Sequence, residues 1–107
     1  MKISFDFDST LGEIRTQKLA LKFINDGHEV WITTSRMDDN TNPRWNQDVK
    51  SVSEKLGINP EHIQYTNGGD KWPLLKGFDI HFDDDSLEIE LIEENLTNCV
   101  GVLILDL

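Results

Sequence analysis

Cysteine is nearly absent from this sequence. Cys99 is the only one among 107 residues, so no disulfide bond can form within the chain. It begins an apolar run that continues to Leu105, and we expect its thiol to be buried in the core. No apolar run approaches the roughly 18 residues that a membrane-spanning helix needs. Acidic residues stand where a secretory signal peptide has an apolar stretch, so we expect a cytoplasmic protein without a membrane partner.

Positive charge is also scarce. Ten Lys and Arg residues stand against twenty Asp and Glu residues, which gives a formal net charge of −10. Nucleic-acid phosphates and anionic membrane surfaces both attract basic proteins, so this balance makes nucleic acid an unfavourable partner. Carboxylates that converge in space would instead concentrate divalent cations. The length suits one domain, residues 1–107.

Strand-like and helix-like patterns alternate along the chain. Strands are expected at residues 2–7, 29–33, 62–65, 78–82 and 100–105, and helices at residues 13–26, 45–56, 71–76 and 86–95. This alternation predicts an α/β fold, namely a Rossmann-like three-layer α/β/α sandwich around a five-stranded parallel sheet. Strands of such sheets are covered on both faces, and we expect this also of residues 102–105.

Two helix starts carry capping signals. Asp70 precedes the short helix expected at residues 71–76, and Pro73 is tolerated there because it falls in the first turn. Asp85 and Glu88 have the spacing of a capping box, with Asp in place of the usual Ser or Thr.

Acidic and hydroxyl side chains follow three of the expected strands. Asp6 and Asp8 end the first strand, Thr34 and Ser35 follow the second, and residues 83–85 follow the fourth. Open parallel sheets bind ligands beyond the carboxyl ends of their strands, so these groups should share one edge. If the first strand continued, Asp6 and Asp8 would point to the same side. Paired carboxylates of this kind favour a hard cation such as Mg²⁺.

Four segments resemble the motifs of the haloacid dehalogenase (HAD) superfamily. Residues 5–11, Phe-Asp-Phe-Asp-Ser-Thr-Leu, resemble the first motif, and residues 32–36, Ile-Thr-Thr-Ser-Arg, resemble the second. Lys71 matches the lysine of the third, and residues 80–84, Ile-His-Phe-Asp-Asp, resemble the fourth. All four occur in the family's order on the expected strands and loops. The resemblance covers nearly the whole chain.

The resemblance implies a Mg²⁺-dependent phosphohydrolase that acts on phosphate monoesters through an aspartyl-phosphate. Asp6 would be the nucleophile and Asp8 the general acid and base. Thr34 would bind a phosphoryl oxygen, and Lys71 would neutralise charge. The metal would bind Asp6, the main-chain carbonyl of Asp8, Asp83, and Asp84 directly or through water.

Several of these assignments have alternatives. Thr10 either forms the turn after the first strand or helps to hold Asp8, and Ser35 could replace Thr34 in the phosphate contact. Lys76 competes with Lys71, although its place at a helix end also fits a C-terminal cap. Arg36 and the loop at residues 36–44 either contact the leaving group or form an exposed connection. His28, His62 and His81 lack metal-binding spacing and are interpreted as structural or surface residues.

Neither site at which HAD proteins carry a cap domain has room for one in this sequence. The site should therefore be open. Members of the family without a cap act on large substrates or use a neighbouring subunit as a lid, so a homodimer is plausible. The Thr34–Arg36 segment resembles nucleotidase-like members, but the sequence does not identify the phosphorylated substrate. The alternative is a catalytically silent HAD-like domain that binds metal or a phosphorylated ligand, or serves in protein interaction.

Overall fold

The centre of the molecule is a sheet of five parallel strands. The structure is a computed structural model that describes residues 1–38, 42 and 44–105; part of the 36–44 loop, residues 39–41 and 43, lies outside this range. The strands are β1 (Lys2–Phe5), β2 (Glu29–Thr34), β3 (Ile63–Tyr65), β4 (Ile80–Asp83) and β5 (Val100–Leu103), in the spatial order β3-β2-β1-β4-β5. The α/β class and the all-parallel sheet are thereby confirmed.

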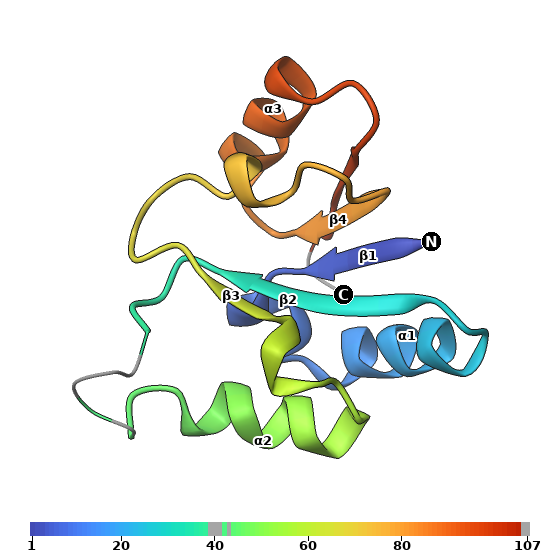
Figure 1. The fold of residues 1–107 in the computed structure, drawn as a ribbon, viewed down its shortest axis with the longest axis vertical. Helices are drawn as coiled ribbons and strands as arrows, with labels where there is room; N and C mark the ends of the chain where they lie inside the picture. Colours follow the sequence, from blue (N-terminus) through green and yellow to red (C-terminus); the bar gives the residue numbers. More distant parts are fainter. Residues whose placement is uncertain (39–41, 43, 106–107) are drawn as a thin grey trace.

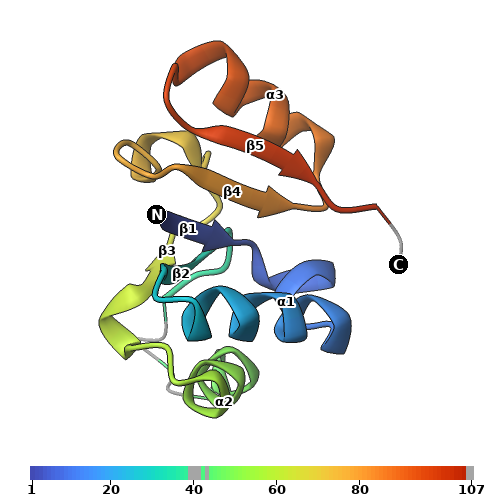
Figure 2. The same cartoon turned by 90° about the vertical axis from the view of Figure 1, so that its right-hand side faces the viewer.

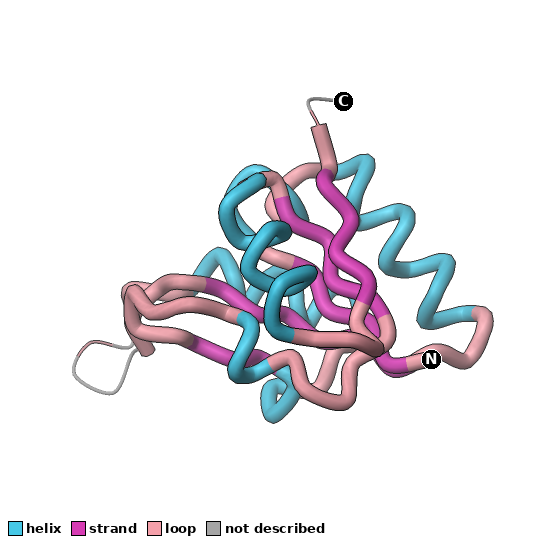
Figure 3. The backbone as a smooth tube through the Cα atoms, turned by 90° about the horizontal axis from the view of Figure 1, so that it is seen from above, coloured by secondary structure: helices cyan, strands magenta, loops and turns pink. Residues whose placement is uncertain are grey.

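Helices cover both faces of this sheet, as Figures 1 and 2 show. Helices α1 (Ile14–Asn25) and α2 (Gln47–Leu56) lie on one face, and α3 (Ser86–Asn95) lies on the other with the short turn η3 (Trp72–Leu74). Right-handed crossovers explain this, because strand order runs in one direction from β1 to β3 and in the other from β4 to β5. Seen from above, helices lie on both sides of the strands (Figure 3).

Each face of the sheet has its own apolar core. Ile3, Phe5 and Ile32 pack beneath α1 and α2, whereas Leu75, Phe78 and Ile92 pack beneath α3. Cys99 belongs to the second core and is buried, as expected. The three-layer architecture is therefore held by two separate sets of apolar contacts, one on each side of the sheet.

The strand order reverses between β1 and β4. These strands are paired in register from Ile3–Ile80 to Phe5–Phe82, and the amide of Asp6 donates a hydrogen bond to the Phe82 carbonyl at 2.8 Å. The connections that leave the two strands go to opposite faces of the sheet, and open parallel sheets bind ligands at the carboxyl ends of strands at such a point. Asp6 directly follows β1, and Asp83 is the last residue of β4.

The first strand is shorter than expected. It ends at Phe5, and residues Phe7–Leu11 form a tight helical turn, η1, in which Leu11 and Gly12 donate to the carbonyls of Asp6 and Phe7. Ser9 adopts a left-handed conformation with φ of 59° inside this turn. The expectation that Asp6 and Asp8 project from one side of a continuing strand is therefore wrong, because the chain turns between them.

The last strand is also less buried than expected. Val100 and Leu103 of β5 are exposed, and so is Leu105, because β5 has only one strand neighbour and lies at the edge of the sheet. Its covered face meets α3 closely: a Cβ on Gly101 would lie 3.2 Å from the Ile89 side chain. Glycine therefore allows α3 to approach this strand.

Two local expectations are wrong. Residues 71–76 form only the short turn η3, and Asp70 does not cap it, because Lys71 holds the N-cap position and no side chain caps this turn. Asp85 does cap α3 by accepting from the Leu87 amide at 2.9 Å, but Glu88 does not complete a capping box. Glu88 accepts instead from the Lys71 amide at 3.1 Å, which ties η3 to α3.

The described residues contain no inserted domain at either expected cap position. Only η1 separates β1 from α1, and a short connection leads from β3 to η3. Among these residues no helix has both the length and the apolar character that crossing a membrane requires.

Candidate active site

A buried lysine joins two aspartates at the carboxyl ends of β1 and β4. Lys71 Nζ lies 2.8 Å from Asp6 Oδ1 and 2.7 Å from Asp83 Oδ2. The three residues are only 3%, 5% and 0% exposed, respectively. Of the two candidate lysines, Lys71 contacts both aspartates, whereas Lys76 is exposed and lies over the Trp72 ring. We call Asp6, Lys71 and Asp83 the buried cluster.

A line of polar side chains supports the buried cluster from within the sheet. His81 Nε2 lies 2.8 Å from Asp83 Oδ2, and His81 Nδ1 lies 3.0 Å from Ser4 Oγ. Ser4 is hydrogen-bonded in turn to Thr33, and Thr33 to Gln64. The line crosses four neighbouring strands, since these residues belong to β4, β1, β2 and β3. The interpretation of His81 as a structural residue fits this position, and its role is to fix Asp83.

The two carboxylates of the buried cluster differ in their proton affinity. Burial raises the pKa of Asp6 to about 7, although the positive charge of Lys71 acts against this shift. Burial also acts to raise the pKa of Asp83, but the hydrogen bond with His81 and the charge of Lys71 outweigh it and lower that pKa to about 2. Burial lowers the pKa of His81, which favours a neutral imidazole. For Lys71, the charges of Asp6 and Asp83 outweigh the effect of burial and raise the pKa.

The buried cluster also belongs to a group that fits a divalent cation. One carboxylate oxygen each from Asp6, Asp83 and Asp84 lies within 4.8 Å of the other two. Oxygen ligands of Mg²⁺ stand about 3 to 4 Å apart, so small side-chain rotations would bring these atoms into range. Asp84 is exposed, which leaves room for water or substrate on that side. The donors are hard oxygens with an excess of negative charge, as Mg²⁺ prefers.

The hydroxyl residues predicted for the site take different positions. Thr10 is buried and its Oγ1 donates to Asp6 Oδ2 at 3.3 Å, so it contacts Asp6. Thr34 is buried at the end of β2, where its Oγ1 accepts from the Arg36 amide at 3.3 Å. Ser35 is exposed on the same edge. A phosphate contact by Thr34 or by Ser35 stays a prediction.

Asp8 lies outside the buried cluster and contacts Arg36. Arg36 Nε and Nη2 donate to the two oxygens of Asp8 at 3.0 and 2.7 Å, and Nη1 and Nη2 donate to Asp48 at 2.7 and 2.9 Å. The guanidinium also lies over the Phe7 ring, 5.0 Å from its centre. The hydrogen bonds that Arg36 donates to Asp8 and Asp48 raise the pKa of Arg36, which keeps it charged. We call Asp8, Arg36 and Asp48 the surface cluster.

Three residues of this edge escaped the sequence-based prediction of the site. Asp48 lies in the first turn of α2, and that turn follows the carboxyl end of β2, so its place in the topology was a usable signal. His81 precedes Asp83 by two residues in β4 and therefore shares its side of the strand. Glu88 had no usable signal, because its contact depends on how η3 packs against α3.

Comparisons with known proteins do not assign this chain to a family. No protein-family model matches this sequence, and a search of the curated proteins gave no match. The resemblance to the HAD superfamily therefore stays a prediction that rests on the four motifs.

Proposed function

We propose that this chain is a Mg²⁺-dependent phosphohydrolase that cleaves phosphate monoesters through an aspartyl-phosphate on Asp6. The observation that carries the proposal is the buried cluster: the Asp6 carboxylate lies where the strand order reverses, with Lys71 Nζ 2.8 Å away. Burial strengthens electrostatic interactions with a phosphoryl group, and phosphoryl transfer depends mainly on such interactions. Asp83 and Asp84 complete a donor set for the metal.

Asp6 acts first as the nucleophile. One of its carboxylate oxygens attacks phosphorus, so a bond from Asp6 to phosphorus forms and the bond from phosphorus to the ester oxygen breaks. Asp8, once it has left Arg36 and taken up a proton from solvent, gives this proton to the departing oxygen. Water then attacks phosphorus, Asp8 takes a proton from this water, and the bond to Asp6 breaks to release phosphate. When bound, Mg²⁺ supplies positive charge that stabilises the phosphoryl oxygens.

Lys71 and Thr10 prepare Asp6 for this attack. Lys71 fixes one carboxylate oxygen and offsets negative charge as the phosphoryl group approaches, and Thr10 donates to the other oxygen. Asp83 holds Lys71 in place, and His81 holds Asp83. The nucleophile is therefore oriented by contacts that extend into the interior of the sheet.

The proposed role of Asp8 requires an exchange of partners. Its carboxylate contacts Arg36, so it has to leave that guanidinium before it can protonate a leaving group. A phosphomonoester dianion is a strong competing partner for Arg36, because guanidinium groups bind phosphate with two parallel hydrogen bonds. Binding of substrate would thus release Asp8 and engage Arg36 in the same event.

The test is Mg²⁺-dependent phosphate release from an aryl phosphate, and from a nucleotide, a phosphopeptide and a 5′-phosphorylated oligonucleotide. We expect the wild type to act on at least one of them only with Mg²⁺, and Asp6→Asn and Asp8→Asn to be inactive. Asp26→Asn is the matched control, because Asp26 is exposed at the far end of α1. A folded wild type that binds Mg²⁺ yet releases no phosphate from any of them would contradict the proposal.

The contact between Asp8 and Arg36 favours one alternative. If Arg36 holds Asp8 permanently, the chain would be a catalytically silent domain that binds Mg²⁺ or a phosphorylated ligand at the same edge. Such a domain would bind a phosphomonoester with Mg²⁺ but never release phosphate, so the assay above separates the two functions.

A further inference from the structure

The two edges of the sheet differ in how well they are protected against another strand. Edge strands expose unpaired backbone N–H and C=O groups, and proteins protect them with very short strands, proline or charged side chains. β3 has only three residues and follows a turn that begins with Pro60. The β5 edge lacks such protection, because residues 95–105 contain no proline and are the longest stretch of the sequence without a charged residue. β5 ends the sheet on its side, with β4 as its neighbour (Figure 2).

The direction of the backbone groups along this edge follows from the bonds between β5 and β4. The amides of Val100 and Ile104 donate to the carbonyls of the residue before β4 and of its last residue, at 2.9 and 2.8 Å. In a parallel ladder, alternate residues of a strand direct both backbone groups to the same neighbour. The N–H and C=O groups of Gly101, Leu103 and Leu105 therefore point away from β4, toward a side on which no described residue forms a strand.

Apolar side chains accompany these outward backbone groups. Val100 is 60% exposed, Leu103 is 37% exposed and Leu105 is 69% exposed. An added strand would cover such side chains and pair with the outward N–H and C=O groups in the same step. The edge of β5 therefore has the two features that favour the addition of a strand.

A second copy of β5 matches this edge. Antiparallel pairing about a two-fold axis between the two Leu103 residues places Gly101 of each copy opposite Leu105 of the other. All of these are pairs in which both residues direct their N–H and C=O groups at each other, so the outward groups of both copies are satisfied. Each chain has a net charge of −10, yet no like charges meet in this register, because residues 95–105 are uncharged.

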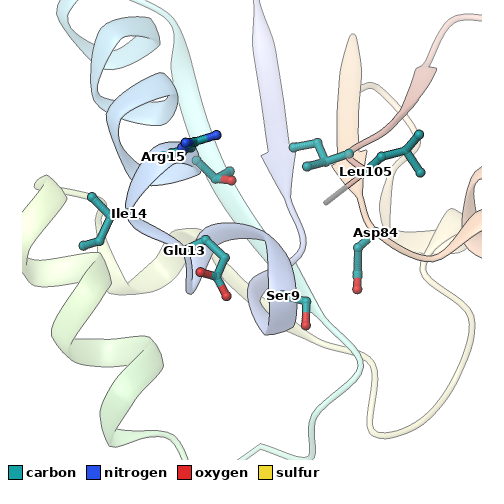
Figure 4. A pocket seen from close by; sticks show the side chains of 8 residues that line it. Ser9, Glu13, Ile14, Arg15, Asp84 and Leu105 are labelled. Atoms are coloured by element: carbon teal, nitrogen blue, oxygen red, sulfur yellow. The ribbon is translucent and has the colours of Figure 1, made fainter. Parts of the chain in front are cut away.

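We infer that this chain forms a homodimer in which two β5 strands pair antiparallel and join the two sheets into one. The inference does not depend on the proposed function. β5 separates the added strand from β4 and the buried cluster, so this contact extends the sheet and is not a lid over the site. Leu105 also lines a pocket of about 610 Å³ beside Asp84, and Figure 4 shows both side chains. The added strand therefore borders that pocket.

The acidic surface of the chain limits the strength of the dimer. α3 packs against β5 and exposes Glu90, Glu93 and Glu94. The two-fold axis is perpendicular to the joined sheet, so the α3 helices of the two copies lie on the same face and repel each other. Salt screens this repulsion and strengthens the dimer. Because one short strand pair is at the small end of specific interfaces, we expect a Kd on the order of 10 to 100 µM at physiological salt.

Sedimentation equilibrium of wild type and two variants tests the dimer. Wild type should change from mostly monomer to mostly dimer between about 5 µM and about 1 mM, and high salt should lower the Kd by at least about twofold. Leu103→Lys places two like charges opposite each other and should raise the Kd at least about tenfold. Leu21→Lys is the matched control, because it adds the same charge at a leucine of similar exposure, 41%, on α1.

Three results of this experiment would overturn the inference. The first is a wild type that stays monomeric at about 1 mM in high salt. The second is equal association of Leu103→Lys and Leu21→Lys. The third is association that weakens as salt rises, which would indicate attraction between opposite charges at another surface.

Hydrogen exchange in the wild type locates the contact without a substitution. The amides of Gly101 and Leu103 should exchange about three to five times more slowly at about 1 mM protein than at about 20 µM, because pairing occupies them. The Tyr65 amide is the internal control: it points outward from β3, at the other edge, and its exchange should not depend on concentration. A dimer without added protection at Gly101 and Leu103 would overturn the inference.

Discussion

Two clusters at the same edge of the sheet each place one cation between two aspartates. In the buried cluster, Lys71 bridges Asp6 and Asp83, whose side chains are 7% and 0% exposed. In the surface cluster, Arg36 bridges Asp8 and Asp48, whose side chains are 56% and 58% exposed. The ion-pair distances are nearly the same, so the clusters differ mainly in burial and in the cation, which is lysine in one and arginine in the other.

The comparison shows that burial, more than the number of ion pairs, decides what such a cluster can do. Water screens the surface cluster, so its partners can exchange at small cost. The carboxylates of the buried cluster have lost their hydration and depend on Lys71, on the hydrogen bonds around them and on any bound metal. The proposed nucleophile, Asp6, lies in the buried cluster, and the proposed acid, Asp8, lies in the surface cluster.

The largest expected effect comes from Lys71→Met. Loss of the ammonium group leaves two buried carboxylates without their cation, so we expect the free energy of unfolding to fall by about 3 to 5 kcal/mol in metal-free buffer. Urea unfolding measures this change. Lys76→Met is the matched control and should have almost no effect, because Lys76 is exposed. If Lys71→Met lowered the free energy of unfolding by less than about 1 kcal/mol, the buried cluster would not be more important for stability than the surface cluster.

The pH dependence of stability should follow from the two shifted carboxyl groups. With its pKa raised to about 7, Asp6 keeps a proton in the folded state that the unfolded chain releases near pH 4. Metal-free wild type should therefore lose stability as pH rises from 4 to 7, by at most about 1.4 kcal/mol per pH unit. Asp83, with its pKa lowered to about 2, stabilises the fold above pH 4 and loses this effect as pH falls further.

Urea unfolding between pH 2 and 8 in the presence of a chelator measures both trends. Asp6→Asn should remove the fall between pH 4 and 7, whereas Asp26→Asn should follow the wild type. Identical slopes for wild type and Asp6→Asn would show that the proton affinity of Asp6 is not raised.

A smaller loss of stability is expected when the hydrogen bonds that support the buried cluster from within the sheet are removed. Thr33→Val breaks the line from His81 to Gln64 and leaves buried polar groups unsatisfied, so we expect a loss of about 1 to 3 kcal/mol. Thr16→Val is the matched control, since Oγ1 of Thr16 has no partner within the described residues; this change should be neutral or slightly stabilising. Thermal unfolding of both variants measures the difference, and an equal loss in both would contradict it.

The smallest effect on stability is expected for Arg36→Gln. Its ion pairs are largely exposed, so the loss should be below about 1 kcal/mol and should vanish at high salt. Urea unfolding at low and high ionic strength measures both features. A salt-independent loss as large as that of Lys71→Met would show that the two clusters are energetically alike.

The sheet and the buried cluster could be predicted from the sequence, because they depend on strong local patterns. Apolar strands at regular spacing fix the α/β alternation, and the rule that ligands bind at carboxyl ends brings Asp6 and Asp83 together. Lys71 was identified from its motif, and the structure places it between these two residues. For the two aspartates, the residue and its strand end were enough.

The contacts of Asp8 and the exposure of β5 could not be predicted in the same way. The path after Phe5 depends on a turn of five residues with a left-handed Ser9, and no periodic pattern reveals such a turn. An apolar strand has the same sequence character at the centre of a sheet and at its edge, so the exposure of Val100 and Leu103 depends on topology. Glu88 was assigned to a cap because its contact with η3 is tertiary.

The most direct test of the central claim is Mg²⁺-dependent phosphate release by Asp6→Asn and Asp48→Asn, measured side by side on the best wild-type substrate. Each variant removes one negative charge from one cluster with almost no change in side-chain volume. If the buried cluster carries the chemistry, Asp6→Asn should lose activity by at least about a thousandfold, whereas Asp48→Asn should stay within about tenfold of wild type. Comparable activity of Asp6→Asn and wild type, or an equal loss in both variants, would contradict the claim.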